Sequence, residues 1–251
     1  MSDDLYKQNL WDKLKKFTSA RIAIGRTGSS IPVHNSLEFK LAHAHARDAV
    51  YSRLDVDKLN SELTRFNLPV LNISSRASYR EQYLQRPDLG RRTDDVSNEI
   101  LQANKGKYDI VIVIADGLSA TAINQNMIDF LASVIPMFKA AKMQLAPICL
   151  VEQGRVAIGD DIGAALNARL SLILIGERPG LSAADSMGAY ITFSPKQGLT
   201  DDSRNCVSNI RPQGLPIHMA AEKIFYLIRQ AFRKQLSGVQ LKDDSDERYF
   251  P

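Results

Sequence analysis

Residues 110–115 read IVIVIA, an unbroken run of apolar and mostly β-branched side chains. Such a run is typical of a strand that is buried on both faces of a parallel sheet. The tetrapeptide DGLS follows at residues 116–119, and a helical stretch begins near Ala120, with Ser119 in the N-cap position. A buried strand, a tight turn and a helix in this order predict the unit from which α/β domains are built.

Strands and helices alternate along the rest of the chain. Short apolar runs bounded by Gly or Pro predict strands, and apolar residues spaced by three or four predict helices. We expect strands at 145–151, 170–175 and 190–193, a helix at 161–168, a loop at 195–211 and a final helix at about 216–236. Because the connections are short, the crossovers should be right-handed and the sheet largely parallel. The sequence therefore predicts a Rossmann-like α/β domain.

The first 106 residues have a different, mainly helical pattern. We expect helices at 4–17, 35–50 and 55–66, followed by a short extended segment at 70–73. Asn35 and Glu38 have the spacing of a capping box at the start of the second helix. The polar segment 104–107 (NKGK) marks a domain boundary. We therefore predict a helical region over 1–106 and a Rossmann-like domain over 107–251, which ends in a charged tail at 242–251.

The composition disfavours several classes of protein. The chain has 251 residues, of which 44% are hydrophobic and 24% charged, as is usual for globular proteins. The net charge of +4 is small and the basic residues are dispersed, so no nucleic-acid partner is expected. No membrane association is expected either, because no apolar run is long enough to cross a bilayer and the acidic N-terminus lacks a signal-peptide core. Cys149 and Cys206 form neither a disulfide framework nor a zinc pattern, which favours a reducing, cytoplasmic location.

The familiar catalytic motifs are missing from the sequence. It has no phosphate-binding G-x-x-x-x-G-K-[ST] loop, no G-x-S-x-G nucleophile turn and no cluster with metal-ligand spacing. It offers instead turns rich in backbone hydrogen-bonding groups, at 116–119, 154–156, 176–180 and 204–210. In an open α/β sheet, ligands bind at the carboxyl ends of the strands. A rim of such turns suits a ligand that carries many amide groups.

Some residues near these turns have two interpretations. Glu177 could act as a general base, but Arg178 lies beside it, and an electrostatic or hydrogen-bonding role fits better. Cys206 is either a reactive thiol or a small contact residue, and no neighbouring His supports the first interpretation. The arginines of segment 84–92 either bind a carboxylate or phosphate group or form salt bridges at helix ends, and we favour the salt bridges.

Seven short motifs, in this order along the chain, resemble the small (light) subunit of ethanolamine ammonia-lyase, an adenosylcobalamin-dependent enzyme. They are ARIAIGRTG at 20–28, AHARDAV at 44–50, LQRPDLGRR at 84–92, DGLS at 116–119, GRV at 154–156, GERPGL at 176–181 and NCVSNI at 205–210. Each motif alone is weak, whereas the ordered set is specific and covers nearly the whole chain.

The resemblance implies a helical N-terminal region, a Rossmann-like C-terminal domain and a hetero-oligomer with a large subunit. In this family the large subunit is a TIM barrel that binds ethanolamine and carries the catalytic residues, so none is expected in this chain. The small subunit covers the lower part of the cobalamin at the subunit interface, with family contacts that fall on Val156, Glu177 and Cys206. The reaction converts ethanolamine to acetaldehyde and ammonia by a radical mechanism.

The resemblance also bears on the binding mode and on location. A base-off cobalamin enzyme carries Asp-x-His-x-x-Gly, and none of the four histidines has Asp two residues before it, namely His34, His43, His45 and His218. This agrees with the base-on adenosylcobalamin of the family. Family members from bacterial microcompartment operons often have a longer N-terminal leader. The first family-like helix here begins almost at Met1, so a packaging leader is not expected in this chain, although the partner could carry the signal.

Two other functions remain open at this point. The chain could be a Rossmann-type scaffold that recognises a nucleotide or a shell protein, as its mild positive charge and the arginines of 84–92 allow. It could also be a hydrolase with Cys206 as nucleophile, which the lack of a neighbouring His disfavours. A cobalamin-binding subunit accounts for both the ordered motifs and the missing catalytic set, and it is the function we expect.

Overall fold

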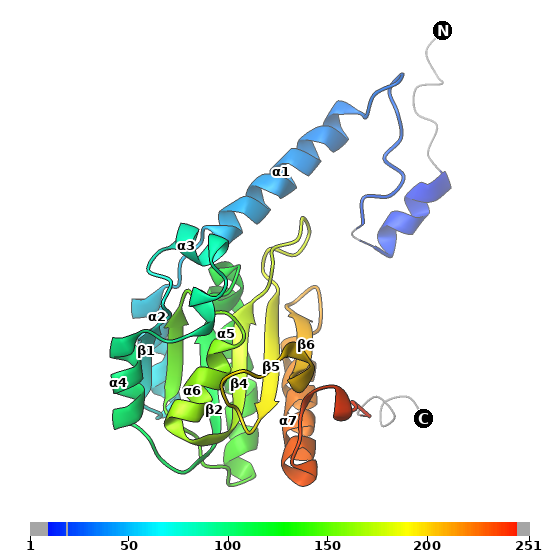
Figure 1. Ribbon diagram of the computed structural model, residues 1–251. Coiled ribbons are helices and arrows are strands. Elements are labelled where there is room, and N and C mark those ends of the chain that lie inside the picture. The colour runs from blue at the N-terminus through cyan, green and yellow to red at the C-terminus, as the bar shows by residue number, and fades with distance from the viewer. Residues whose placement is uncertain (1–9, 19, 245–251) are drawn as a thin grey trace.

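The structure is a computed structural model that describes residues 10–18 and 20–244 (Figure 1). At its centre is a six-stranded sheet with the strand order β1-β3-β2-β4-β5-β6. The strands are β1 (Val70–Ser74), β2 (Tyr108–Ala115), β3 (Ile148–Glu152), β4 (Ala168–Gly176), β5 (Met187–Phe193) and β6 (Asn205–Ile210). Strands β1, β3, β2 and β4 are parallel, whereas β5 is antiparallel to β4 and β6 is antiparallel to β5. The predicted α/β class with a largely parallel sheet is confirmed.

Helices cover both faces of this sheet, as Figure 1 shows. The α-helices are α1 (Val33–Val50), α2 (Val56–Leu63), α3 (Arg80–Gln85), α4 (Asp95–Ala103), α5 (Ala120–Ala140), α6 (Ile158–Leu166) and α7 (Ile217–Lys234). The side chains of β2 alternate between two core clusters. Ile112 packs with residues of α5 and α7, and Val113 packs with residues of α6 and α4. Because both faces of β2 are buried, its sequence is apolar throughout.

The N-terminal helices differ in how they pack. Leu59 and Leu63 of α2 are fully buried in the core, whereas the only buried residue of α1 is Ala49. In Figure 1, α1 projects away from the body of the molecule. Its last residue, Val50, is anchored at the end of the sheet, because its carbonyl oxygen accepts a hydrogen bond from Arg80 Nε at 2.7 Å. Arg80 also bonds the turn that follows β2, so α1 leaves the molecule from the edge at which the parallel strands end.

The expected start of α1 and the expected capping bond of α5 differ from the structure. α1 begins at Val33, directly after a proline that fixes φ and has no N–H to satisfy, and not at Asn35. Asn35 and Glu38 therefore lie within the helix and form no capping box. Ser119 does occupy the N-cap of α5, but its side chain makes no capping bond, because the hydroxyl donates to the Ala184 carbonyl at 2.7 Å.

The loop predicted at 195–211 is wrong in part, because residues 205–210 form β6. This strand lacks a regular alternation. Val207 and Ile210 are buried three positions apart, and Asn209 has a φ of 57°. An irregular edge strand of this kind has no period of two for the sequence to display. The strand predicted at 145–151 likewise starts later, at Ile148.

The sheet also takes in a strand from the N-terminal part of the chain. Strand β1 precedes the predicted boundary at residue 106 and pairs with β3 along its whole length. The boundary itself stays a prediction. Of the helix predicted at 4–17, residues 10–16 form the 3-10 helix η1 (Leu10–Lys16), and residues 4–9 lie outside the described residues, as does the tail at 245–251. In the part of the chain that is described, no helix is both long and apolar enough to cross a membrane.

A substitution at the end of β4 tests how closely the strand-end turns approach each other. A Cβ on Gly176 would collide with the backbone oxygens of Ser119 and Asp116. We expect Gly176→Ala to lower the free energy of unfolding by about 1–3 kcal/mol, the cost of overpacking a site that cannot move. Chemical denaturation measures this. The control is Gly180→Ala, whose new methyl group would make only an ordinary contact at 3.8 Å with Ala183, so a change within about 0.5 kcal/mol is expected. Equal effects of the two substitutions would contradict the close approach.

Candidate functional site

Three of the turns noted in the sequence meet at one edge of the sheet. They follow β2, β3 and β4, and β2 lies between the other two strands. The chain runs from β2 to β3 on one side and then to β4 on the other, so this edge is the topological switch point, where open α/β sheets bind ligands. The Leu118 N–H donates to the Gly176 carbonyl at 2.9 Å, which joins the turns after β2 and β4.

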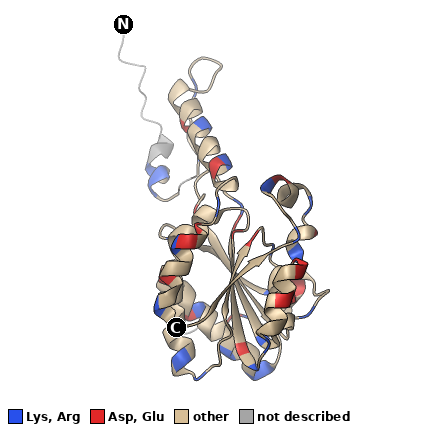
Figure 2. Cartoon of the chain, turned by 90° about the vertical axis from the view of Figure 1, so that its left-hand side faces the viewer, with Lys and Arg blue, Asp and Glu red and all other residues tan. Residues whose placement is uncertain are grey.

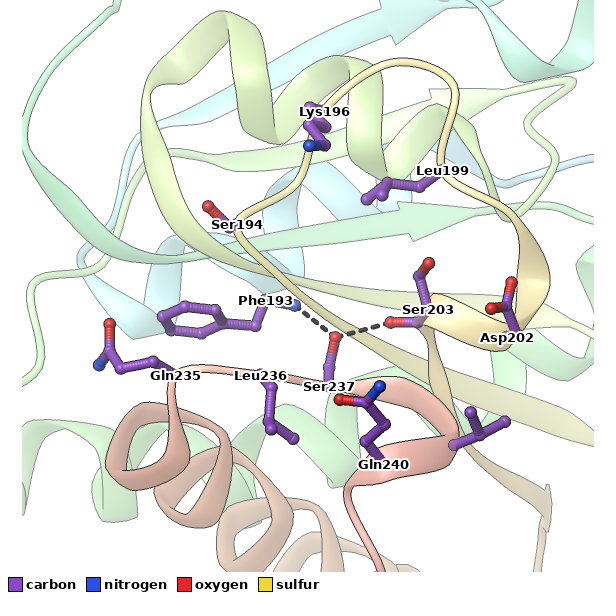
Figure 3. A pocket seen from close by; sticks show the side chains of 11 residues that line it. Phe193, Ser194, Lys196, Leu199, Asp202, Ser203, Gln235, Leu236, Ser237 and Gln240 are labelled. Carbon is purple, nitrogen blue, oxygen red and sulfur yellow. Dashed lines mark hydrogen bonds between the residues drawn. The ribbon is translucent and has the colours of Figure 1, made fainter.

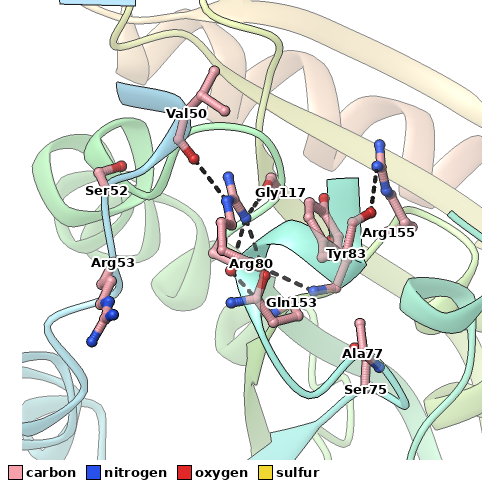
Figure 4. Close-up of polar contacts among 12 residues, drawn as sticks. Val50, Ser52, Arg53, Ser75, Ala77, Arg80, Tyr83, Gly117, Gln153 and Arg155 are labelled. Carbon is pink, nitrogen blue, oxygen red and sulfur yellow. Dashed lines mark hydrogen bonds and ion pairs between the residues drawn. The ribbon is translucent and has the colours of Figure 1, made fainter. Parts of the chain in front are cut away.

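The carboxylate of Asp116 joins the turns after β2 and β3. Asp116 is only 3% exposed, and its two oxygens accept hydrogen bonds from the N–H groups of Gln153 and Gly154, each at 3.0 Å. Arg80 Nη1 lies 3.4 Å from this carboxylate and donates to the Gly117 carbonyl at 2.9 Å (Figure 4). Burial raises the pKa of Asp116 to about 6, although Arg80 and the N–H donors act in the opposite direction.

Tyr83 of α3 fixes the turn after β3 from the other side. Its buried ring lies between two guanidinium groups, with its centroid 4.7 Å from Arg80 and 4.2 Å from Arg155. Its hydroxyl donates to the Gly154 carbonyl at 3.1 Å, and Arg155 Nη2 donates to the Tyr83 carbonyl at 3.0 Å (Figure 4). Sequence reasoning missed Arg80 and Tyr83, because their partners lie up to 73 positions away and leave no local motif.

Two of the three arginines of segment 84–92 form ion pairs within the chain. Arg86 pairs with Asp88 at 2.7 Å on the surface. Arg92 pairs at 3.2 Å with Asp161, a buried residue at the start of α6. Both contacts agree with the salt-bridge interpretation of these two residues.

Glu177 lies directly after β4 and crosses toward β5 and β6. Its Oε2 accepts hydrogen bonds from the Ser186 hydroxyl and from the Asn209 N–H, the latter at 3.2 Å. Its other oxygen, Oε1, has no hydrogen-bond donor among the described residues, and Arg178 forms no ion pair with it there. Glu177 is therefore held at one oxygen and keeps the other as a free acceptor.

Cys206 lies near Glu177, on the exposed edge strand β6. It pairs with Tyr190 of β5, and the two side chains interact. Burial is the largest cause that raises the pKa of the Cys206 thiol, and the Glu177 charge adds to it, against a hydrogen bond from Tyr190. A raised pKa keeps the thiol protonated near neutral pH, which is the opposite of what an activated nucleophile requires. Tyr190 was not identified from the sequence, which marked it only as the start of an extended segment.

Val156 lies farther along the same face of the sheet. Both Val156 and Tyr190 pack at the margin of the core cluster on the α6 side. Val156 lies in the turn that follows β3, and Gly159, three residues later, lies against Ser171 and Ile173 of β4, two strands away from β6. The structure thus brings Glu177 and Cys206 together and places Val156 apart from them on the same face.

The remaining chemistry of the described chain is structural. Residues 10–18 and 20–244 contain no group of three or more His, Cys, Asp or Glu that could hold a metal ion. A hollow at the far end of β5, shown in Figure 3, is lined by residues such as Phe193 and Gln235. There Ser237 Oγ accepts from the Phe193 N–H at 2.9 Å and donates to the Ser203 carbonyl at 2.6 Å, so these polar groups satisfy each other. The site at the carboxyl edge can bind and orient a ligand through its own hydrogen-bonding groups.

Comparison with known proteins gives a consistent result along the chain. A family model described as "Ethanolamine ammonia-lyase light chain (EutC)" matches residues 8–242. The "Ethanolamine ammonia-lyase small subunit" of Pseudomonas fluorescens (strain Pf0-1) is 50% identical over 242 residues, covering 95% of this chain and 88% of that protein. The protein of the same name from Azotobacter vinelandii (strain DJ / ATCC BAA-1303) is 49% identical over 243 residues, covering 95% of this chain and 90% of its own length.

The burial of Asp116 predicts a pH dependence of stability. Its pKa is about 6 in the folded chain and about 4 in an unfolded one. The folded chain therefore binds this proton more tightly than the unfolded chain does. Protonation of Asp116 contributes its full stabilisation of the fold below about pH 4, and this contribution is lost as the pH rises through about 6. In Asp116→Asn the group cannot titrate. We expect the free energy of unfolding of wild type to fall relative to that of Asp116→Asn between about pH 4 and pH 7 in urea titrations.

A surface control accompanies this comparison. Asp57→Asn, at an exposed position of α2, reports on the effect of the substitution itself. A difference between wild type and Asp116→Asn that stays constant over this pH range would contradict the raised pKa.

Proposed function

Because the chain belongs to the family of ethanolamine ammonia-lyase light chains, we propose that it helps to hold adenosylcobalamin at an interface with a large subunit. It is a subunit of a carbon–nitrogen lyase, and its family name implies a large-subunit partner. The reaction we propose for the complex is the conversion of ethanolamine to acetaldehyde and ammonia by a radical mechanism. The large subunit, a TIM barrel in this proposal, binds ethanolamine and carries the catalytic residues.

The observation that carries the proposal is the extent of the binding rim. Val156 in the turn after β3, Glu177 in the turn after β4 and Cys206 in β6 lie on one face, which suits a ligand wider than a mononucleotide base. The rim offers a free carboxylate oxygen, a protonated thiol and an apolar side chain. These groups fit a large neutral ring system with amide side chains at its periphery, as the corrin has.

Each of the three residues has a separate part in this proposal. Glu177 accepts hydrogen bonds through Oε1 from amide groups of the corrin or from the nucleotide tail. Val156 and Cys206 make van der Waals or backbone contacts. When bound, the cofactor supplies the radical chemistry, whereas the residues of this chain only position it and exclude water. No histidine of this chain follows the base-off pattern, so in our proposal the cofactor's own base remains on cobalt.

Helix α1 supports the proposed partner. Its exposed Val33, Leu37 and Leu41 follow one another at intervals of four, so they lie along one side of the helix. Figure 2 shows only scattered charged residues on this helix. Apolar side chains that project from the edge carrying the cofactor site favour cover by the large subunit. We place the complex in the cytoplasm, with a bacterial microcompartment as the alternative, because the thiols of Cys149 and Cys206 are free.

Reconstitution tests the proposed function. The full chain alone should show no lyase activity, because in this proposal the large subunit carries the catalytic residues. Mixed with its large subunit and adenosylcobalamin, it should release acetaldehyde from ethanolamine, and the complex should show a cobalamin absorption band that depends on this chain. Undiminished activity of the large subunit without this chain would refute the proposal. A complex without a chain-dependent cobalamin band would favour the scaffold function instead.

A second test concerns the thiol. If Cys206 is a contact residue, Cys206→Ala should retain part of the activity of the reconstituted complex, because only side-chain contacts of one residue are lost. Steady-state kinetics and a cobalamin titration measure the two effects separately. Complete loss of activity with cobalamin binding unchanged would instead support a nucleophilic role of the thiol.

A further inference from the structure

Two residues of β5, Gly188 and Tyr190, extend the site beyond Val156, Glu177 and Cys206. We propose that Gly188 leaves the space on the sheet that the Glu177 carboxylate occupies, and that this carboxylate recognises corrin amide groups and not the phosphate of the nucleotide tail. Tyr190, in the same proposal, is a positioning residue for Cys206. This inference rests on the proposed function and names the chemistry of the ligand group that the site accepts.

Gly188 leaves the space that the Glu177 side chain fills. It pairs across the sheet with Ile175, two residues before Glu177. A Cβ on Gly188 would lie 2.9 Å from Oε1 and 3.2 Å from Cγ of Glu177, closer than the carboxylate can tolerate without moving. The φ of Gly188 is not positive, so its backbone does not itself require glycine. The requirement comes from the carboxylate, which lies against the bare backbone of β5.

The way Glu177 is held identifies the oxygen that meets a ligand. Oε2 is bound by the Ser186 hydroxyl and the Asn209 N–H, and Oε1 is the free oxygen that lies over Gly188. A methyl group at Gly188 would therefore displace the free acceptor directly. Its partner in a ligand must be a donor such as an amide N–H, because a carboxylate repels a phosphate.

Tyr190 is the next residue of β5 on this face after Gly188. Its ring packs against the cluster on the α6 side, and it pairs directly with Cys206 on the neighbouring strand, so the two side chains lie side by side on one face. Burial is the largest cause that raises the pKa of Tyr190, so the hydroxyl stays protonated and can donate. In our proposal, a hydrogen bond from the Tyr190 hydroxyl orients the sulfur of Cys206, and Tyr190 acts on the ligand through that sulfur.

A double-mutant cycle tests the role of Gly188. The complex of this chain with its large subunit is titrated with hydroxocobalamin, and binding is followed by absorbance. We expect Gly188→Ala to weaken binding at least tenfold in the wild-type background and less than twofold in the Glu177→Ala background, because the two residues act through one contact. Equal effects in both backgrounds, or no effect in either, would overturn the role of Gly188. A wild-type complex that binds no hydroxocobalamin would instead reject the proposed function.

A titration with cobinamide, which retains corrin amides but lacks the nucleotide tail, tests which part of the ligand Glu177 contacts. The expected result is that Gly188→Ala weakens the binding of cobinamide by the same factor as that of hydroxocobalamin. An effect confined to hydroxocobalamin would show that Glu177 meets the tail, against our inference.

The role of Tyr190 has a separate readout. Tyr190→Phe keeps the ring and removes the hydroxyl, so the pKa of Cys206 should rise and less thiolate should be present at a given pH. We expect slower alkylation of Cys206 by iodoacetamide at pH 8 in the full chain, with the buried Cys149 as the unreactive control. An unchanged alkylation rate would overturn the positioning role.

Discussion

A single buried carboxylate connects the turns on which this site depends. Asp116 ends the apolar run of β2 and bonds the backbone of the next strand-end turn at Gln153 and Gly154. Its burial is costly, since desolvation raises its pKa, and the chain offsets that cost with Arg80 and two backbone donors. A buried polar group that is fully bonded specifies one arrangement of the surrounding backbone. The turn that carries Val156 therefore has a defined place relative to β2.

Arg80 extends this connection to the N-terminal part of the chain. One guanidinium group bonds the carbonyl oxygens of Val50 and Gly117 and pairs with Asp116. The end of α1, the turn after β2 and the turn after β3 are thus fixed together at one edge of the sheet. Consequently, the projecting apolar side of α1 lies on the same side of the molecule as the proposed cofactor site. One partner subunit can cover both.

The site itself is suited to holding a ligand rather than to transforming one. Glu177 is bound at one oxygen and free at the other, and the thiol of Cys206 is kept protonated by burial. The free oxygen offers an acceptor to a ligand, and a protonated thiol disfavours a nucleophilic role. Both features favour the proposed binding role, in which a cofactor carries the chemistry.

The sequence alone determined the fold class and the location of the strand-end turns. The run 110–115 is apolar because β2 is buried on both faces, a condition that local composition reveals. The ordered motifs also identified the family. By contrast, the irregular strand β6, the start of α1 and the residues Arg80, Tyr83, Gly188 and Tyr190 were not predicted. Their roles depend on contacts between residues distant in the chain, which leave no periodic pattern. Only the packed tertiary structure places the Glu177 carboxylate over Gly188, because the space for that side chain is created by pairing two strands and not by either strand alone.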